Sequence, residues 1–277
     1  MSSRIPNLGL GIGWRPELAL AIDRRPDLGF VELMAEDFEP SEPLSPAIER
    51  LRRRGVRLVP HGVSLSLGGA EPLDRGRLDH LARLARSCDA PLVSEHIAFV
   101  RADGTETGHL LPIPRTRAAL EVVVAHVREA QALLPVPLAL ENIATLIEWP
   151  ENEFDEATFL TEILERTDVL LLLDIENVYA NARNYGPDPL ALLDHLPLER
   201  LAYVHIAGGH DRDGLYHDTH TDPVPTGVLT LLEELANRCP IPGVMLERDG
   251  RFPSQTELDA ELDAIAGAAR RGVCHVG

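Results

Sequence analysis

The stretch VLLLLDIENVY, residues 169–179, decides the fold of this chain. Its unbroken apolar run is typical of a parallel strand that is buried on both faces. The polar residues that follow the run fall at the carboxyl end of that strand. Because parallel strands are joined by crossover connections, usually helices, the stretch predicts strands and helices in alternation along the chain.

Seven other short apolar runs, bounded by turns, predict further strands. They lie at 8–13, 30–36, 57–68, 92–100, 137–143, 201–209 and 243–250. Between most of them lie segments of helical period, such as RAALEVVVAHVREAQALL and DEATFLTEILERT. Eight such units in 277 residues predict a (β/α)8 TIM barrel that forms a single domain over residues 1–277. A doubly wound open sheet is the weaker alternative, because no GxGxxG motif opens a helix after the first strand.

Composition and charge exclude several classes of partner. The formal net charge of −18 would repel nucleic acid phosphates and anionic lipid, so we expect neither nucleic acid nor membrane as a partner. The chain has no apolar run long enough to span a bilayer and no signal-peptide pattern at its start. Its three cysteines lie far apart, which suits a reducing compartment. We therefore expect a cytoplasmic protein.

Residues of metal-binding type stand at the end of strand after strand. In a barrel enzyme the carboxyl ends of the strands carry the chemistry, so these side chains are expected to face one site. The loop at 204–223, VHIAGGHDRDGLYHDTHTDP, would deliver two more of them over the same mouth. The candidates are Glu36, His61, Glu95, His96, Glu141, Asn142, Asp174, Glu176, Asn177, His205, Glu247 and Asp249 at the strand ends, with Asp218 and His220 in the loop.

The mixture of imidazoles and carboxylates, without cysteine, indicates zinc, manganese or iron, because calcium and magnesium sites are built mainly from oxygen. The candidates exceed the needs of one ion, so two or three metals bridged by a carboxylate are expected. The alternative is that each residue is an ordinary polar group and that 204–223 is a solvated loop. A polar residue at nearly every strand end makes that alternative the weaker one.

Motifs in these same regions resemble a known family. In order, they are HGVSLSLG (61–68), SEHIAF (94–99), LLPIP (110–114), LENIA (140–144), LLDIENVY (172–179), HIAGGH (205–210), DTHTDPV (218–224) and LERD (246–249). Together they resemble the multinuclear non-haem iron-dependent oxidative enzymes, which were long a bacterial domain family of unknown function and include an oxidase of methanobactin biosynthesis. The resemblance runs from about Gly9 to Asp249 and implies a barrel of the xylose-isomerase-like superfamily.

The resemblance also implies an activity and a set of site residues. Such enzymes hold two or three irons in mixed Fe(II)/Fe(III) states and use O2 to modify a residue, often cysteine, of a ribosomally made precursor peptide. A separate partner protein often grips the leader segment of that peptide. The implied metal ligands are His61, His96, Glu141, Asp174, Asn177, His205, Asp218, His220 and Glu247. Asp174, Glu176 and His210 are the residues expected to act in catalysis.

Three departures from the family pattern fall close to these residues. Glu176 stands where asparagine is common, and it could ligate metal, hold a histidine or face substrate. If it lies outside the ligand set, Glu176→Gln should keep nearly all the iron, whereas Asp174→Ala should lose metal. The pair Gly208-Gly209 shifts His210 by one position, which leaves the role of this histidine open. Arg248 replaces a frequent tryptophan, so the substrate need not be that of any studied relative.

Two other functions use the same residues. A divalent-metal hydrolase or isomerase on the same barrel would need the same ligand types, with zinc or manganese activating water. A non-catalytic peptide-binding protein is the third candidate, and ligand-type residues at so many strand ends argue against it.

Overall fold

The computed structural model describes residues 5–271 and shows a closed barrel of eight parallel strands. The barrel strands are β1 (Gly9–Gly13), β2 (Leu28–Met34), β3 (Arg57–Gly62), β4 (Val93–His96), β7 (Leu138–Glu141), β8 (Leu170–Asp174), β9 (Leu201–Ile206) and β12 (Gly243–Leu246). They follow one another around the barrel in chain order, and β12 closes it by pairing with β1. The predicted TIM barrel is therefore confirmed.

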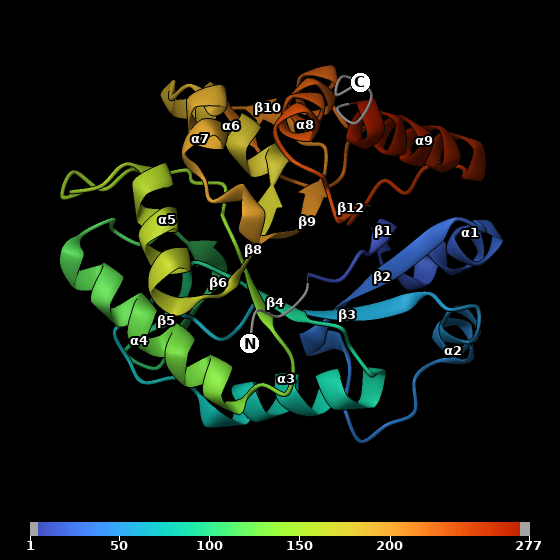
Figure 1. Ribbon diagram of the computed structural model, residues 1–277, viewed down its shortest axis with the longest axis horizontal. Helices are drawn as coiled ribbons and strands as arrows, with labels where there is room; N and C mark the ends of the chain where they lie inside the picture. Colours follow the sequence, from blue (N-terminus) through green and yellow to red (C-terminus); the bar gives the residue numbers. More distant parts are fainter. Residues whose placement is uncertain (1–4, 272–277) are drawn as a thin grey trace.

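Helices surround the barrel and fill the connections between its strands (Figure 1). They are α1 (Ala19–Arg24), α2 (Pro46–Arg53), α3 (Arg75–Cys88), α4 (Arg117–Leu133), α5 (Glu156–Thr167), α6 (Ile175–Tyr185), α7 (Pro189–His195), α8 (Thr226–Arg238) and α9 (Gln255–Arg271). Three short 3-10 helices lie at Pro16–Leu18, Ala35–Asp37 and Leu198–Arg200. None of the helices within residues 5–271 has the length and apolar character to cross a bilayer.

Two separate cores hold this arrangement together. Inside the barrel, Phe30, Val59, Leu172, Tyr203 and Met245 are fully buried. A larger apolar layer lies between the outer faces of the strands and the helices. Burial on both faces explains why the strands read as continuous apolar runs.

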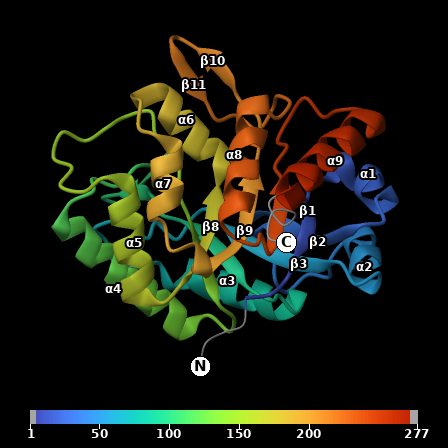
Figure 2. The same ribbon diagram turned by 45° about the horizontal axis from the view of Figure 1, so that its top comes forward.

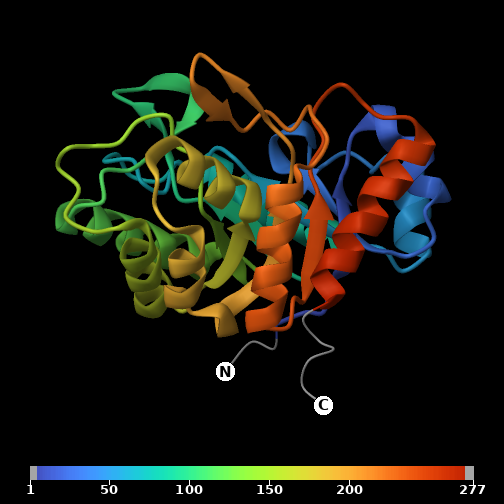
Figure 3. The ribbon, with the colours of Figure 1, turned by 90° about the horizontal axis from the view of Figure 1, so that it is seen from above.

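Two antiparallel hairpins were not expected from the sequence. One consists of β5 (Phe99–Ala102) and β6 (Thr105–Leu111), and the other of β10 (His210–Arg212) and β11 (Leu215–His217). Both stand on the same side of the barrel (Figure 3), and the β10–β11 hairpin projects beyond the helices (Figure 2). The predicted strand at 92–100 is thus divided between β4 and β5, and the predicted strand at 57–68 ends at Gly62.

The predicted strand at 169–179 was too long, because β8 ends at Asp174 and α6 begins at Ile175. Asp174 caps this helix: its Oδ1 accepts a hydrogen bond of 2.8 Å from the backbone N–H of Asn177. Glu176 and Asn177 therefore lie in the first helical turn, where successive side chains point about 100° apart and do not alternate as they would on a strand.

Candidate metal centre

The polar residues at the strand ends converge in one cluster at the mouth of the barrel. Their ligand atoms form three groups, within each of which all atoms lie within 4.8 Å of one another. The groups are His61, His96 and Glu141; Glu141, Asp174, His205 and Glu247; and Glu176, Asp218 and His220. Glu141 belongs to the first two groups, so its carboxylate is placed to bridge them. Eight of the nine residues that the resemblance implies as ligands are present here, together with Glu176.

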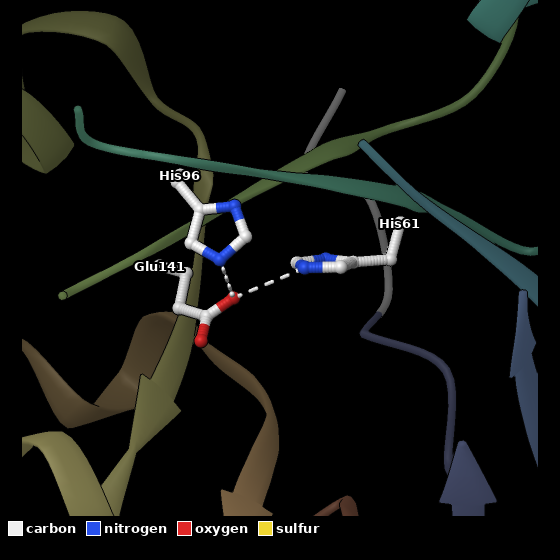
Figure 4. Close-up of side chains that lie close together, drawn as sticks. All are labelled: His61, His96 and Glu141. Carbon is white, nitrogen blue, oxygen red and sulfur yellow. Dashed lines mark ion pairs between the residues drawn. The ribbon is translucent and has the colours of Figure 1, made fainter. Parts of the chain in front are cut away.

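The first group joins three neighbouring strands. His61 lies on β3, His96 ends β4 and Glu141 ends β7, with His96 and Glu141 in register. The Nε2 atoms of His61 and His96 lie 3.5 and 3.3 Å from the same Oε2 atom of Glu141, as Figure 4 shows. All three side chains are buried, so the two imidazoles and one carboxylate face a common point away from bulk water.

Asn177 is the ninth implied ligand, and the end of β8 sets its orientation. Its Nδ2 donates to the carbonyl oxygen of Asn142, at 3.0 Å. The Asn142 side chain in turn bonds the backbone of Asp174 at both its N–H and its carbonyl, at 2.9 and 3.0 Å. This arrangement leaves Oδ1 of Asn177 without a hydrogen bond, and Asn177 lines the cavity above the cluster.

The third group comes from α6 and from the segment after the β10–β11 hairpin. Tyr216 on β11 donates to Oε1 of Glu176 at 2.9 Å and accepts from the backbone N–H of Gly209 at 2.8 Å. A Cβ at Gly209 would lie 2.0 Å from the carbonyl oxygen of His217 and 2.8 Å from Oε1 of Glu176. Glycine is therefore required where the hairpin crosses Glu176.

His210 is predicted to act in catalysis, but the structure does not bring it to the cluster. It starts β10 just after the two glycines, and its Nδ1 lies 2.9 Å from the Asp222 carboxylate. It belongs to none of the three groups and does not line the cavity above them.

Each histidine of the cluster turns one ring nitrogen to the centre and bonds the other to a partner outside it. Nδ1 of His61 lies 2.8 Å from Oγ of Ser94, and Nδ1 of His96 lies 3.2 Å from the carbonyl oxygen of Gly62. Nε2 of His205 lies 3.0 Å from Glu32, and Nδ1 of His220 lies 3.0 Å from Asp249. Metal-bound histidines are held in this way in proteins, with the outer N–H donated to a carboxylate, carbonyl or hydroxyl oxygen.

The cluster contains many buried polar atoms that lack a hydrogen bond of suitable geometry. Among the described residues nine buried side-chain atoms have no such partner, and seven of them belong to Glu141, Asp174, Glu176, Asn177, His205, Asp218 and His220. The other two belong to Arg200 and Arg248. Two of the seven, Oδ1 of Asp218 and Nε2 of His220, face each other as an ion pair at 2.7 Å. So many buried donor atoms in one place are typical of a metal-binding site.

The buried carboxylates favour the protonated form of two of the cluster histidines. Burial opposes the charged form of His96, but the neighbouring Glu141 and Glu95 carboxylates raise the pKa of His96 to about 9. Burial likewise opposes charge on His205, yet the Glu247 and Glu32 carboxylates raise its pKa well above the usual value. His61 differs, because burial lowers its pKa to about 3.

Two acids of the cluster shift in opposite directions. Burial and the Glu141 carboxylate raise the pKa of Asp174 well above its usual range. Burial acts in the same direction on Glu247, but the nearby imidazoles of His205 and His220 hold the pKa of Glu247 well below its usual range. Bound metal would replace these protons, since carboxylates and imidazoles bind metal in their deprotonated forms.

A cavity of about 710 Å³ opens above the cluster and is framed by both hairpins. One wall is apolar, with Ile143, Leu146 and Ile147 after β7 and Leu110 and Leu111 on β6. The other wall is polar and contains Arg212, His217, Asp218, Thr219 and His220. Leu146 and Ile147 are 48% and 46% exposed, which is unusual for large apolar side chains and leaves them free to contact a ligand.

Arg248 does not belong to the site, contrary to the expectation from the sequence. Its guanidinium is buried and bonds both carboxylate oxygens of Glu261 on α9, at 2.7 and 2.6 Å. Arg248 therefore links the end of β12 to α9, and it gives no information about the substrate.

Three residues that support the cluster were missed in the sequence. Glu32 on β2, Ser94 on β4 and Tyr203 on β9 are buried beside the histidines. Glu32 could have been found, because a lone acid inside the apolar run FVELMAE is costly to bury without a partner. Tyr203 stands two residues before His205, so the two side chains share one face of β9.

Comparison with known proteins identifies relatives along nearly the whole chain. A family model described as "RiPP precursor modification enzyme MbnB/TglH/ChrH" matches residues 9–270. A "UPF0276 protein" of Streptomyces avermitilis is 55% identical over 265 residues, which are 93% of this chain and 54% of the relative. A protein of the same designation from Bordetella bronchiseptica is 41% identical over 272 residues, which are 95% of this chain and 93% of the relative. The chain thus spans about half of the Streptomyces protein.

Solved structures share the fold at low sequence identity. A xylose isomerase domain protein from Planctomyces limnophilus superposes with a TM-score of 0.60 at 13% identity, over 98% of this chain and 99% of that one. Endonuclease IV from Thermus thermophilus has the same TM-score at 19% identity, over 94% and 99%. D-psicose 3-epimerase from Clostridium cellulolyticum reaches 0.53 at 14%, over 96% of each chain. At these identities the likeness shows the fold alone.

Proposed function

The chain belongs to the family of RiPP precursor modification enzymes described as MbnB/TglH/ChrH, and on that premise we propose that it is an iron-dependent oxidase acting on a ribosomally made precursor peptide. It would hold two or three irons in mixed Fe(II)/Fe(III) states and use O2 as co-substrate. The residue modified would be a cysteine, as the resemblance implies, and a separate protein would grip the leader of the peptide.

The observation that carries the proposal is the set of seven buried atoms without a hydrogen bond on the candidate ligands. Carboxylate, amide and imidazole atoms are electron-pair donors, and bound cations, one at each group, would satisfy them. The donor set includes four imidazoles, five carboxylates and the Asn177 amide, and the three groups contain no thiolate. Nitrogen and oxygen donors in this mixture suit iron, manganese or zinc.

Three groups that share one carboxylate favour a centre of up to three metals. His61 and His96 would hold one ion, Asp174, His205 and Glu247 a second, and Glu141 would bridge them. Glu176, Asp218 and His220 would hold a third. Iron bound there would supply the redox chemistry that activates O2.

The rest of the site would position the peptide. The cavity is wide enough for a side chain and its flanking residues, and its two hairpins frame the opening. Leu146 and Ile147 would contact apolar parts of the peptide and keep water from the cluster. On the facing wall, His217 and Arg212 would contact peptide carbonyls or a carboxylate.

Metal analysis of protein purified without oxygen tests the proposal. We expect about two to three irons per chain after growth with added iron, because the ligands exceed what one octahedral ion can use. Mössbauer spectra should contain both Fe(II) and Fe(III). Co-expression with a short peptide from the gene neighbourhood should then change the peptide mass, and purified enzyme should consume O2 with that peptide.

Two outcomes would contradict the oxidase. Stoichiometric zinc or manganese with turnover in the absence of iron and O2 would identify a hydrolase or isomerase instead. Tight peptide binding with no change of peptide mass in the iron-loaded protein would indicate a non-catalytic peptide-binding role.

A further inference from the structure

A chain of buried hydrogen bonds runs beneath the metal centre and connects two of its histidines. Nδ1 of His61 lies 2.8 Å from Oγ of Ser94, and Ser94 lies 2.7 Å from the hydroxyl of Tyr203. That hydroxyl lies 2.6 Å from Oε2 of Glu32, and the same oxygen lies 3.0 Å from Nε2 of His205. The members come from β3, β4, β9 and β2, so the chain crosses the inside of the barrel.

We propose that Glu32, Tyr203 and Ser94 are positioning residues that fix which ring nitrogen of His61 and of His205 faces the metals. The inference rests on the proposed metal centre, but it concerns residues to which no part of the proposed function assigns a role. Glu32, Ser94 and Tyr203 are at most 4% exposed, so the chain of hydrogen bonds is closed off from bulk water.

The direction of the hydrogen bonds follows from the one member that only accepts. Oε2 of Glu32 is a carboxylate oxygen with two hydrogen-bond neighbours, and in this geometry Tyr203 and His205 both donate to it. Because Tyr203 donates its only hydroxyl proton in the hydrogen bond to Glu32, its oxygen accepts a hydrogen bond from Ser94. Ser94 has then used its only proton and must accept from His61.

This order determines the tautomer of both histidines. With metal bound, His205 would keep its remaining proton on Nε2 and offer Nδ1, the nitrogen that lies 3.1 and 3.3 Å from the carboxylates of Glu247 and Glu141. His61 carries its proton on Nδ1 and turns Nε2 to Glu141. His205 therefore presents Nδ1 and His61 presents Nε2 to the same centre. The Glu32 carboxylate determines the tautomer of both rings.

The chain also explains a buried tyrosine at this position. Tyr203 packs edge-on against Phe30 at 5.6 Å between ring centroids, a contact that phenylalanine would make equally well. The hydroxyl adds nothing to this packing, and its contacts are to Glu32 and Ser94. Its role is therefore to connect Glu32, through Ser94, to His61, so that the direction of one hydrogen bond determines the next.

Zinc, which is diamagnetic, can probe the chain without turnover. We would measure the zinc affinity of metal-free protein by competition with a chelator, and the proton position on each histidine by 15N–1H NMR of the zinc-loaded protein. In the wild type we expect a proton on Nε2 of His205 and on Nδ1 of His61. Glu32→Gln should weaken zinc binding by ~10–100-fold, the usual loss when the outer partner of a ligand histidine is removed. Glu32→Asp should recover part of the affinity.

Tyr203→Phe tests whether Tyr203 transmits the direction of the hydrogen bonds from Glu32 to His61. Without the phenol oxygen, Ser94 is free to turn and donate to Nδ1 of His61, which would move the His61 proton to Nε2. We therefore expect altered His61 signals and weaker zinc binding, by up to ~10-fold, from a change at a residue that makes no hydrogen bond to His61. Ser94→Ala added to Tyr203→Phe should cost less than Ser94→Ala alone, because the two act through one chain.

Thr167→Val is the matched control. Thr167 is buried at the end of α5, and its hydroxyl donates to the Ile163 carbonyl at 2.6 Å, away from the cluster. It should lower stability without changing zinc affinity or histidine signals. Additive effects of Tyr203→Phe and Ser94→Ala, or unchanged His61 signals in Tyr203→Phe, would overturn the inference. A wild type that binds no zinc and no iron would instead overturn the proposed metal centre.

Discussion

Glu176 has surroundings that favour direct contact with metal. Its carboxylate lies with Asp218 and His220, and its Oε2 has no hydrogen bond. Burial and the neighbouring Asp218 raise the pKa of Glu176, as expected for two acids that share a proton where no cation is bound. Of the three roles that the sequence left open, we therefore favour ligation.

The corresponding prediction is that Glu176→Gln loses about one metal ion per chain. The amide keeps the hydrogen bond from Tyr216 and the shape of the side chain, but it removes the negative charge that a third ion needs. Elemental analysis of iron-loaded protein measures the loss. Glu261→Gln breaks a buried ion pair outside the cluster and should keep the metal content of the wild type. Full iron content in Glu176→Gln would show that Glu176 lies outside the ligand set.

Asp174 needs a more careful substitution than alanine. Its Oδ1 caps α6, whereas its Oδ2 is unpaired and belongs to the second group of ligands. Asp174→Ala loses both functions, and loss of the cap alone costs about 1 kcal/mol. Asp174→Asn keeps a capping oxygen and loses the charge, so we expect both variants to lose metal and only Asp174→Ala to lose helix stability as well. Equal thermal stability of the two metal-free variants would contradict the capping role.

At the scale of the residue, the sequence revealed candidate ligands but not their supports. Histidines and acids at successive strand ends are visible in a one-dimensional pattern, because parallel strands end at one face. Glu32, Ser94 and Tyr203 lie within the strands, and their connection across the barrel depends on register. Arg248 shows the converse: its place in the sequence, next to Glu247, suggested the site, but its side chain points to α9.

At the scale of the element, contacts with the cluster contribute part of the order of the segment that follows β9. Asp218 and His220 belong to the third group, whereas the hairpin before them is fixed by Arg183, which bonds Asp211 at 2.9 Å, and by Asn184, which bonds the backbone of Tyr216. The surface ion pair contributes little, at most ~1 kcal/mol. Backbone hydrogen bonds also hold the segment, from Asp249 to His220 at 2.8 Å and from Asp222 to Gly208 at 3.3 Å. Bound metal would add to the order of residues 209–223.

We predict that chelation makes this segment the first site of proteolysis. Limited digestion of metal-free protein, followed by mass spectrometry of the fragments, should place early cuts within 209–223, and added iron should suppress them. The β5–β6 hairpin is the internal control, because it contributes no ligand to the three groups. Equal protection of both hairpins with and without metal would show that the segment is held without the cluster.

The errors in predicted elements have a common cause. An apolar run marks a buried strand but not its last residue, so 169–179 and 57–68 were both extended past the turn. Asp174 caps the eleven-residue helix α6, and a capping aspartate is a signal that was visible in the sequence. The two hairpins are short and polar, and neither sequence shows the alternating apolar pattern that is typical of a half-buried strand.

At the scale of the whole molecule, the alternation of strands and helices was enough to predict the barrel. That architecture separates stability from chemistry: the apolar layer between strands and helices lies on the outer face of the barrel, and the cluster lies at one end. The cluster also has an internal substitute for metal, because the raised pKa values of His96 and His205 let protons balance the buried carboxylates. Losing the metal therefore need not leave the carboxylates without counter-charge.

The last prediction is that the metal-free protein remains a folded barrel of lower thermal stability. Far-ultraviolet circular dichroism should be nearly unchanged on chelation, since the strands and helices do not depend on the cluster. The melting temperature should rise again with added iron, because a ligand that binds only the folded state stabilises it, by about 2.7 kcal/mol at a hundred times its dissociation constant. Loss of the dichroism signal on chelation would mean that the barrel closes only around its metals, and that the cluster is structural before it is catalytic.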